Sequence, residues 1–428
     1  MIIIVYITKI ISFLLNLVKI SGGTSLPGLL IENYFPHIIT KLSKQYKVIV
    51  LITGTNGKTS TQRILAHILT VKDMKVNSNK SGANLLRGII TSVINDTNLL
   101  LRIKCDIAIF EVEEASLPIL TKYIKSDFIV VTNIFRDQLD LYGELVKTRN
   151  LIVEGIKNNL NSHVFLNKDD PYVTSIKNDI NNTVTYYKIK DKRKKNILYE
   201  ILYKTSRTQK VDRYIYARDI ILRKDLSSTF YVYGLDKKSY KISINNPGIE
   251  NIYNTIAALS VAFKIVKLSD EDLNKAFLTL KQVFGRGEII KIGEKVLRLF
   301  LIKNPASFTS NLETIKNINV LKLMIIINDK IADGKDVSWL WDVKFSVLKR
   351  TNISWVIISG KRAYDMDVRL KYTDLNLGNI ETETNLNKAF DIALSKLSDG
   401  ETLFILPNYT AMLEIRKIIG QLVKVDKY

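Results

Sequence analysis

A glycine-rich loop between an apolar run and a helical pattern constrains this chain more than any other feature. The loop covers residues 54–59 and reads GTNGKT, the apolar run covers 47–53, and the helical pattern covers 59–69. This order is typical of a phosphate-binding loop, because backbone N–H groups and a helix N-terminus surround the phosphates. A glycine turn with a coincidental lysine is the alternative, and the flanking strand and helix argue against it. The predicted nucleotide-binding residues here are Gly54, Thr55, Asn56, Gly57, Lys58 and Thr59.

Two side chains of this loop have predicted roles of their own. The Lys58 ammonium would contact the outer phosphates, and the Thr59 hydroxyl would bind Mg²⁺. Ile52 stands where the standard pattern has its first glycine, so the spacing is tighter than usual.

Apolar runs alternate with helical patterns along most of the chain. Strands are predicted over 47–53, 105–112, 128–132, 322–328, 355–360 and 402–406. Such alternation favours an α/β fold with parallel sheets. Residues 185–245 differ, because alternating Tyr, Ile and Lys there indicate antiparallel strands. We therefore expect a helical lead-in over 1–45 packed on the central domain. The central phosphate-loop domain is expected over 46–284, with a small β-rich insertion over 185–245. A smaller C-terminal α/β domain is expected over 285–428.

The composition excludes several classes of protein. A single cysteine, Cys105, and three histidines among 428 residues exclude a disulfide framework, a Cys-rich zinc site and a metal centre built from histidines. The net charge of +21 is compatible with nucleic acid or an anionic membrane as partner. However, the lysines are spread over the whole chain, and no stretch interleaves clustered arginines with aromatic residues as a nucleic-acid groove would. We therefore expect a composition bias and no nucleic-acid partner.

The first 20 residues are mostly apolar, but Lys9, Asn16 and Lys19 interrupt the run. A membrane-spanning helix needs about 20 apolar residues with few charges. We therefore expect an amphipathic helix packed on the first domain, with a weak contact to a membrane surface as the open alternative.

Polar side chains follow two of the predicted strands. Glu111 ends one strand, with Glu113 and Glu114 close behind it, and Asn133 follows another. The carboxyl ends of parallel strands form the edge at which α/β sheets bind ligands. Because Mg²⁺ prefers oxygen ligands, Glu111 is the candidate metal ligand beside Thr59. An acidic helix start is the alternative interpretation of this segment.

Two further segments carry candidate nucleotide contacts. Asn251 and Asn254 lie one turn apart on one face of a helix predicted over 251–268, and Asn amides can read an adenine edge. The alternative is a helix cap followed by an exposed asparagine. Arg286 lies between two glycines at the predicted domain junction, where it could cross the cleft to a phosphate. A flexible linker is the alternative there.

A loop rich in carboxylates follows the strand predicted over 322–328. It contains Asp333 and Asp336 in the sequence DGKD. EF-hand spacing does not fit, because no Glu occupies the closing position. The open alternatives are a functional loop and a turn with helix caps.

Taken together, these segments resemble the Mur ligase family. Its hallmarks are a TGTNGKT-type loop, a Glu after the next strand, a TN-x-x-x-D-x-x-D segment, an N-x-x-N-x-x-A-A helix and a G-R-x-E hinge, and all five occur here in the family's order. Further segments are similar specifically to the MurT branch of the family. They are 22–28 (GGTSLPG), 83–88 (ANLLRG), 135–140 (FRDQLD), 167–171 (NKDDP), 303–306 (KNPA), 333–339 (DGKDVSW) and 407–410 (PNYT).

The resemblance implies an ATP-dependent amidation. ATP would phosphorylate the α-carboxyl of D-glutamate in the lipid II stem peptide, and ammonia from a GatD-type glutaminase subunit would convert the acyl phosphate to D-isoglutamine. The resemblance further implies ATP and Mg²⁺ as cofactors, a heterodimer with the glutaminase, and a cytoplasmic location that allows contact with the inner face of the membrane. It also implies that Asp336 first, and Asp333 second, serve the site or its junction with the glutaminase.

The chain departs from the family pattern at two places. MurT proteins commonly carry a four-cysteine zinc ribbon, and the corresponding region, about 188–215, has no cysteine, so we expect no zinc. Amino-acid-adding Mur ligases usually have a His where Gln138 stands. A stand-alone Mur-type amino-acid ligase is the alternative function, and Gln138 together with the C-terminal segments argues against it.

Overall fold

The computed structural model describes residue 6 and residues 26–79, 83–136, 145–191, 214–236, 238–281 and 285–423. Apart from Tyr6, the helix expected over 1–20 lies outside these ranges. Helices α2 (Leu26–Tyr34) and α3 (His37–Ser43) pack on the first domain through apolar side chains that include Ile31 and Ile39. Within the described ranges, no helix is long and apolar enough to cross a membrane.

Nine strands of the described residues form the central sheet, in the order β2-β3-β1-β4-β5-β6-β7-β8-β9. Neighbouring strands from β2 to β7 run parallel, and β8 is antiparallel to both of its neighbours, β7 and β9. In sheet order the strands are β2 (Val76–Ser78), β3 (Ile107–Glu111), β1 (Val48–Thr53), β4 (Phe128–Val131), β5 (His163–Asn167), β6 (Val184–Ile189), β7 (Tyr214–Leu222), β8 (Ser228–Tyr233) and β9 (Tyr240–Ile244).

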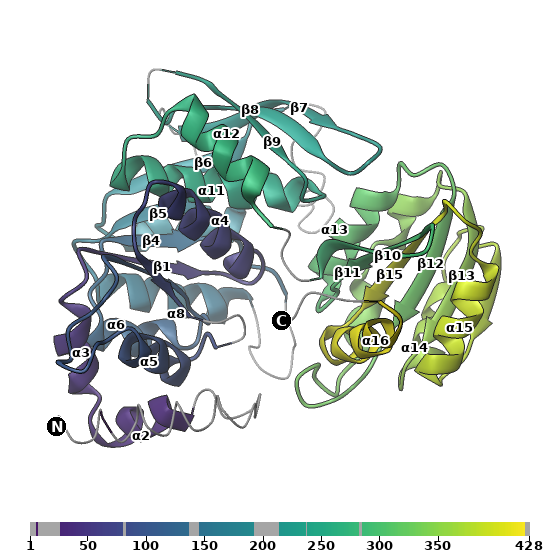
Figure 1. Cartoon of the computed structure of the whole chain (residues 1–428), viewed down its shortest axis with the longest axis horizontal. Helices are drawn as coiled ribbons and strands as arrows, with labels where there is room; N and C mark the ends of the chain where they lie inside the picture. The colour runs from purple at the N-terminus through teal and green to yellow at the C-terminus, as the bar shows by residue number, and fades with distance from the viewer. Residues whose placement is uncertain are drawn as a thin grey trace.

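Helices cover both faces of this sheet, as Figure 1 shows. Successive side chains of a strand point to opposite faces, so Val50 and Ile52 of β1 join one core while Ile49 and Leu51 join the other. The first core is closed by α4 (Lys58–Val71), α11 (Ile249–Ile265) and α12 (Asp270–Thr279). The second is closed by α3, α5 (Leu86–Asn95), α6 (Leu117–Tyr123), α8 (Leu145–Lys157) and α9 (Pro171–Ser175), which continues into the 3-10 turn η1 (Ile176–Asp179).

The structure differs from the sequence-based expectation at two places. The strands expected to be antiparallel over 185–245 include β6, which instead pairs in parallel with β5 and with β7, and β6 to β9 extend the central sheet. Their side chains, such as Phe230 and Ile242, complete the core beneath α11 and α12. Cys105, expected inside a strand, lies just before β3 and is half-buried.

Six strands within residues 285–423 form the second sheet, in the order β10-β11-β15-β12-β13-β14. β10 and β11 form an antiparallel hairpin, and the remaining pairs are parallel. The strands are β10 (Arg286–Ile292), β11 (Lys295–Phe300), β15 (Thr402–Pro407), β12 (Leu321–Ile326), β13 (Ile353–Ser359) and β14 (Asn379–Thr382). One face carries α13 (Pro305–Ile315), η2 (Ser338–Asp342), η3 (Phe345–Leu348) and α14 (Ala363–Lys371), and the other carries α15 (Leu386–Lys396) and α16 (Tyr409–Leu422).

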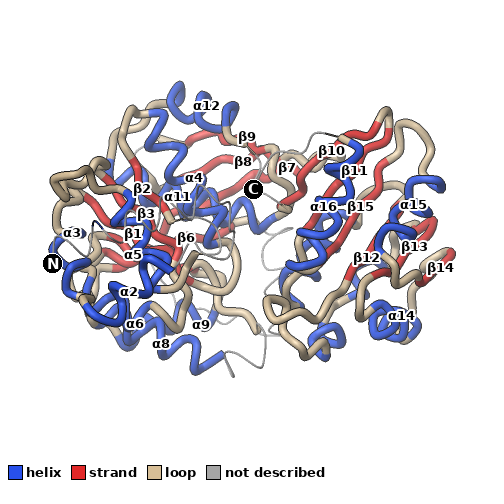
Figure 2. Tube along the Cα trace, turned by 60° about the horizontal axis from the view of Figure 1, so that its bottom comes forward, coloured by secondary structure: helices blue, strands red, loops and turns tan. Residues whose placement is uncertain are grey.

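The two sheets lie beside one another as two α/β domains, each with helices on both faces, which confirms the predicted fold (Figure 1, Figure 2). The central domain presents the carboxyl ends of β1, β3 and β4, and the second domain contacts this edge through the loop that follows β11. The candidate site lies where these two domains meet.

Candidate functional site

The loop over residues 54–59 joins β1 to α4, and its backbone conformation requires glycine at two positions. Gly54 has φ +117° and Gly57 has φ +87°, which are left-handed values that other residues rarely adopt. A Cβ on Gly57 would lie 2.2 Å from Oδ1 of Asn254, so the space is closed as well. Gly57 is also the N-cap of α4, so the free N–H groups of the first helical turn point into the loop. The predicted strand–loop–helix arrangement is therefore present.

Lys58 is 6% exposed and lies over the loop. Its ammonium donates to the carbonyl oxygen of Gly54 at 2.7 Å, and it lies 3.4 Å from Oε1 of Glu114 and 3.6 Å from Oε2 of Glu113. Burial raises the pKa of the Glu114 carboxyl to about 8, and the charge of Lys58 opposes this rise. The two acidic residues therefore hold the ammonium at the loop, within reach of an anion bound there.

Thr59 and Glu111 meet as the sequence predicted. The Thr59 hydroxyl donates to Oε2 of Glu111 at 2.7 Å, and Glu111 is 5% exposed at the end of β3. Asn79 fixes the Glu111 backbone, because its side chain accepts from the Glu111 N–H and donates to the Glu111 carbonyl, both at 2.9 Å. Gln62 of α4 donates to Asn79 at 2.7 Å. A hydroxyl and a carboxylate are thus fixed next to the phosphate loop, which is a donor set that suits Mg²⁺.

Asn133 follows β4 and holds the loop from the other side. Its Oδ1 accepts from the backbone N–H of Asn56 at 2.8 Å, and its Nδ2 donates to the Asn56 carbonyl at 3.0 Å. The Asn133 carbonyl also accepts from the N–H of Thr55 at 2.9 Å. Asn133 therefore sets the conformation of the loop.

Of the two asparagines that the sequence singled out on helix α11, Asn254 lies against the loop over residues 54–59 and Asn251 does not. Asn254 accepts from the Thr61 hydroxyl at 3.4 Å and packs against Gly57, whereas Asn251 donates to the Pro247 carbonyl at 2.6 Å and acts as a helix-end residue. Asn254 belongs to the wall of a small cavity beside the loop. The cavity is lined by Asn56, Gly57, Thr132, Asn133, Tyr187, Glu250, Tyr253 and Asn254.

Glu250 is a half-buried residue in that wall, and the sequence did not point to it. Its Oε1 is enclosed and has no hydrogen-bond partner among the described residues. Burial raises the pKa of Glu250 to about 7, while Arg286, Ser310 and Lys303 act in the opposite direction. The predicted hinge residue Arg286 therefore lies close enough for its charge to act on this carboxylate.

Contacts between the domains join the loop to the second domain. The side-chain amides of Asn56 and Asn304 face each other, with N···O distances of 3.3 and 3.4 Å. Lys303 donates to the Thr55 carbonyl at 3.0 Å. Further along the interface, Arg136 and Asp342 form an exposed ion pair at 3.4 Å. The residues 303–304 after β11 are therefore part of the site.

The acidic loop lies at the same carboxyl edge of the second sheet. Asp333 is buried and accepts from the backbone N–H and the hydroxyl of Thr410. Asp336 accepts from the N–H of Ser338 at 2.8 Å and from its hydroxyl at 2.9 Å, and these bonds lower the pKa of Asp336. Both carboxylates hold local structure in the second domain.

Other parts of the prediction fall outside what the structure describes. Asp137, Gln138 and Asp140 lie in the range 137–144, and most of the expected zinc-ribbon region lies in 192–213. Within the described ranges, no group of three or more His, Cys, Asp or Glu side chains could hold a metal ion. The expectation of no zinc stays a prediction.

Sequence reasoning missed Asn79 as well as Glu250. Asn79 follows β2, which has only three residues and lacks the apolar run that marked the other strands. A polar residue directly after a parallel strand is the pattern that could have identified Asn79. Because β2 is so short, the sequence did not reveal the strand that Asn79 follows. Glu250 is adjacent to Asn251, but nothing in the local pattern distinguishes it from an ordinary acidic residue in a first helical turn.

Two family models match the sequence. The Mur ligase middle domain matches residues 52–262, and the MurT ligase C-terminal domain matches residues 301–412. The first match contains the phosphate loop and α11, and the second contains the loop after β12.

Curated relatives are similar over most of the chain. The subunit MurT of lipid II isoglutaminyl synthase (glutamine-hydrolyzing) from Streptococcus pneumoniae is 31% identical, and the alignment covers 94% of this chain and 93% of the relative. The corresponding subunit from Staphylococcus aureus is 30% identical over 91% of both chains. Among solved structures, MurF ligase from Thermotoga maritima in complex with ADP superimposes with a TM-score of 0.69 at 14% identity, covering 90% of this chain and 82% of that one.

Proposed function

The chain belongs to the MurT branch of the Mur ligase family, and on this basis we propose that it is the ligase subunit of an enzyme that amidates lipid II. In the first step, the α-carboxylate of D-glutamate in the stem peptide attacks the γ-phosphorus of ATP, which gives an acyl phosphate and ADP. In the second step, ammonia attacks the acyl carbon, phosphate leaves, and a proton is lost. The product is D-isoglutamine.

The observation that carries this proposal is the meeting of a phosphate loop with the second domain. Asn56 of the loop contacts Asn304, and Lys303 donates to the carbonyl of Thr55. Phosphoryl transfer depends on positioning and on stabilising charge at the phosphoryl oxygens. Lys58 supplies positive charge at the loop, and Arg286 is the candidate to supply it from the hinge.

Thr59 and Glu111 would hold Mg²⁺ in this proposal. The Thr59 hydroxyl donates to the Glu111 carboxylate, and Asn79 fixes the backbone of Glu111. When bound, the ion neutralises the charge of the phosphate oxygens. Asn254, which lines the small cavity beside the loop, is the candidate to orient the nucleotide base, and Asn133 supports the nucleotide through the conformation of the loop.

A separate glutaminase subunit of the GatD type would supply the ammonia. A glutaminase needs an activated nucleophile, and a cysteine acts as one only as its thiolate. Burial raises the pKa of the Cys105 thiol to about 12, so this thiol stays protonated at neutral pH. The single cysteine of the chain is therefore unsuited to that reaction, which favours a heterodimer with a second subunit.

The place of action follows from the substrate. Lipid II is a membrane-bound anionic molecule, and this chain has a net charge of +21. A basic protein is attracted to anionic surfaces. We expect the enzyme to work in the cytoplasm at the inner face of the membrane.

The experiment that tests the proposal is an amidation assay. The chain is mixed with a co-expressed GatD-type subunit, ATP, Mg²⁺, glutamine and lipid II, and in a second arm with an ammonium salt in place of subunit and glutamine. Replacement of OH by NH₂ lowers the mass of the stem peptide by about one dalton, and Lys58→Ala removes the proposed phosphate contact. We expect a mass change that depends on Lys58. ATP hydrolysis only upon addition of an amino acid, without amidation, would instead indicate a stand-alone Mur-type ligase.

The same assay assigns the two carboxylates of the acidic loop. Asp336→Asn and Asp333→Asn are compared in the glutamine arm and in the ammonium arm. If a variant loses amidation with both glutamine and ammonium, the residue serves the ligase reaction. If it loses amidation with glutamine alone, the residue serves the junction with the glutaminase. Because Asp333 anchors Thr410, its variant is also tested for folding by circular dichroism. We expect Asp336 to have the larger effect on activity and Asp333 the larger effect on stability.

A further inference from the structure

Two charged residues of the hinge point to opposite faces of the second sheet. In the register of β10 and β11, Arg286 pairs with Phe300. Glu288, two residues later on β10, pairs with Leu299, which is only one residue earlier on β11. Directly paired side chains lie on the same face of a sheet. Phe300 belongs to the core beneath α13 and Leu299 to the core beneath α16, so Arg286 is directed to the α13 face and Glu288 to the α16 face.

A β-bulge at Gly287 causes this change of face. Side chains alternate along a regular strand, so Arg286 and Glu288 would otherwise share one face, and the extra residue of a bulge reverses the alternation. Gly287 has φ +82°, and a Cβ there would lie 2.2 Å from Cγ of Pro247, so the bulge needs glycine at this position. Pro247 lies just before α11. The bulge is therefore packed against the part of the central domain that carries Glu250.

On the α13 face, Arg286 acts on the wall of the nucleotide cavity. Burial raises the pKa of Glu250, and the charge of Arg286 opposes this rise. Glu250 lines the small cavity beside the loop over residues 54–59. In the proposed function Arg286 is the candidate to supply positive charge to the phosphoryl oxygens from the hinge. The direction of its side chain therefore decides whether it can act there.

On the α16 face, Glu288 is held by Arg416. Nη1 of Arg416 donates to Oε1 of Glu288, and the two side chains are 9% and 15% exposed. Oε2 of Glu288 accepts from the backbone N–H of Gly285 at 3.3 Å. Gly285 also packs on α16, since a Cβ there would lie 2.7 Å from Cε of Met412. Gly285 and Glu288 are thus both tied to α16, while Arg286 between them faces the other way.

We propose that Arg416 is a positioning residue of the ATP site, which fixes Glu288 and thereby directs Arg286 to the phosphate groups. This inference rests on the proposed function, because it concerns the nucleotide of that reaction. Arg416 lies on the opposite face of the sheet from Arg286, so it acts through the bulge. Loss of Arg416 leaves the Glu288 carboxylate without its cation in a largely buried place, which is unfavourable. Glu288 then moves, and the bulge loses its fixed shape.

A double-mutant cycle with Arg416→Gln and Arg286→Ala tests the proposal. The full chain is titrated in a calorimeter with the magnesium complex of AMPPNP, a non-hydrolysable ATP analogue, and kcat/KM for ATP is measured in the ammonium-driven amidation. Loss of a charge-assisted contact lowers the affinity about tenfold or more, so each single variant should weaken AMPPNP binding by that factor. Effects that pass through one residue are not additive, so Arg416→Gln should change the affinity less than about twofold once Arg286 is replaced.

An unchanged affinity in Arg416→Gln, or an equal loss with and without Arg286, overturns the proposal. The two measurements separate it from the proposed function: the expected cycle in AMPPNP binding, without amidation by the unmodified chain, refutes the amidation and supports the role of Arg416. An unmodified chain that does not bind AMPPNP overturns both. If Arg416→Gln does not fold, Glu288→Gln takes its place in the cycle, because the amide keeps an acceptor for Gly285 and loses only the charge.

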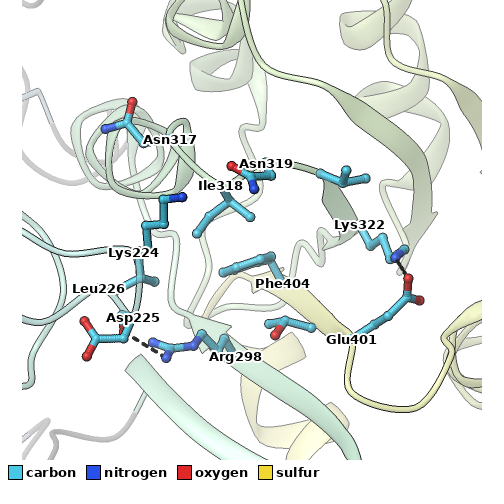
Figure 3. Close-up of a pocket in the computed structure, with 12 residues that line it drawn as sticks. Lys224, Asp225, Leu226, Arg298, Asn317, Ile318, Asn319, Lys322, Glu401 and Phe404 are labelled. Carbon is cyan, nitrogen blue, oxygen red and sulfur yellow. Dashed lines mark hydrogen bonds and ion pairs between the residues drawn. The ribbon is translucent and has the colours of Figure 1, made fainter.

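Lys322→Gln is the matched control. The Lys322 side chain is 12% exposed and forms an ion pair with Glu401, and Figure 3 shows this pair at the wall of a cavity of about 420 Å³. The pair lies near the amino ends of β12 and β15, at the opposite edge of the sheet from Arg286. The control should lower the melting temperature and leave the affinity for AMPPNP unchanged. Arg416→Lys, which keeps the positive charge, should recover part of the affinity that Arg416→Gln loses.

Discussion

The side chain of Asn133 satisfies both backbone groups of Asn56, accepting from its N–H at 2.8 Å and donating to its carbonyl at 3.0 Å. An amide is the side chain that can do both at once, because it has a donor and an acceptor side by side. The phosphate loop is thus held from β4 as well as from β1 and α4. The residue predicted from its place after a strand therefore holds the conformation of the loop over residues 54–59.

Asn133→Ala should raise the KM for ATP by about tenfold or more, because each lost hydrogen bond contributes about 0.5–1.5 kcal/mol to the loop conformation. Steady-state kinetics of the ammonium-driven reaction measure the KM for ATP of this variant. Asn159→Ala is the matched control, since Asn159 is equally buried but accepts from the N–H of Ser126, away from the site. The control should lower the melting temperature and leave the KM unchanged. An unchanged KM in Asn133→Ala would contradict the proposed role.

Glu111→Gln should reduce kcat by about a hundredfold or more, because an amide replaces the carboxylate proposed to hold Mg²⁺ opposite Thr59. Asp106→Asn provides the control. Asp106 lies just before the amino end of β3, the strand that Glu111 ends, and forms an exposed ion pair with Lys47. The activity of both variants is measured over a Mg²⁺ titration. A shift of the Mg²⁺ dependence in Glu111→Gln alone supports the metal role, and equal behaviour of the two variants argues against it.

The sequence was sufficient to predict the elements that surround the phosphate loop. β1 and α4 were predicted to within two residues, because a buried parallel strand is a continuous apolar run and α4 has a helical repeat. The meeting of Glu111 and Thr59 followed from their positions at one edge of a parallel sheet. These features depend on local pattern and on a general property of α/β sheets.

Other features depend on contacts between distant segments. Whether β6 to β9 form a separate unit or extend the sheet is decided by the pairing of β6 with β5, and the strand pattern is the same in both cases. Asn251 and Asn254 lie on one helix face, yet only Asn254 reaches Gly57. The isolation of the Glu250 oxygen arises from burial against the second domain, which no local pattern reveals.

Glu250 should make the protein less stable as the pH rises from about 4.5 to 7. Burial raises its pKa to about 7 from an ordinary value of 4.5, so in this window the folded chain holds a proton that the unfolded chain has released. The contribution is complete below about pH 4.5, falls as the pH rises, and is lost above about 7. It is on the order of 3 kcal/mol. Glu250→Gln should therefore flatten this part of the pH profile.

Urea denaturation at intervals between pH 4.5 and 8 measures this effect. Glu114 and Asp170 also have raised pKa values, near 8 and 7, so the slope should decrease without disappearing. Glu271→Gln is the control, because Glu271 lies exposed in the first turn of α12. The interpretation fails if Glu250→Gln and Glu271→Gln show the same pH profile.

Asn304 connects the two domains in a way that one substitution can isolate. Its Oδ1 caps α13 by accepting from the N–H of Ser307 at 2.8 Å, and its Nδ2 donates to Oδ1 of Asn56 at 3.3 Å. Asn304→Asp keeps the cap, because Asp is as good an N-cap as Asn, but removes this donor. It also places a negative charge beside the proposed phosphate site. The KM for ATP should therefore rise at least tenfold.

Asn385→Asp is the matched control for this substitution. Asn385 caps α15 in the same manner, accepting from the N–H of Lys388 at 3.2 Å, and α15 packs on the opposite face of that sheet from α13. Neither the KM for ATP nor the melting temperature should change in this variant. Asn304→Ala would instead lose the cap and about 1 kcal/mol of stability. A drop in melting temperature for Asn304→Asp as large as that for Asn304→Ala, with an unchanged KM, would show that Asn304 serves only to cap α13.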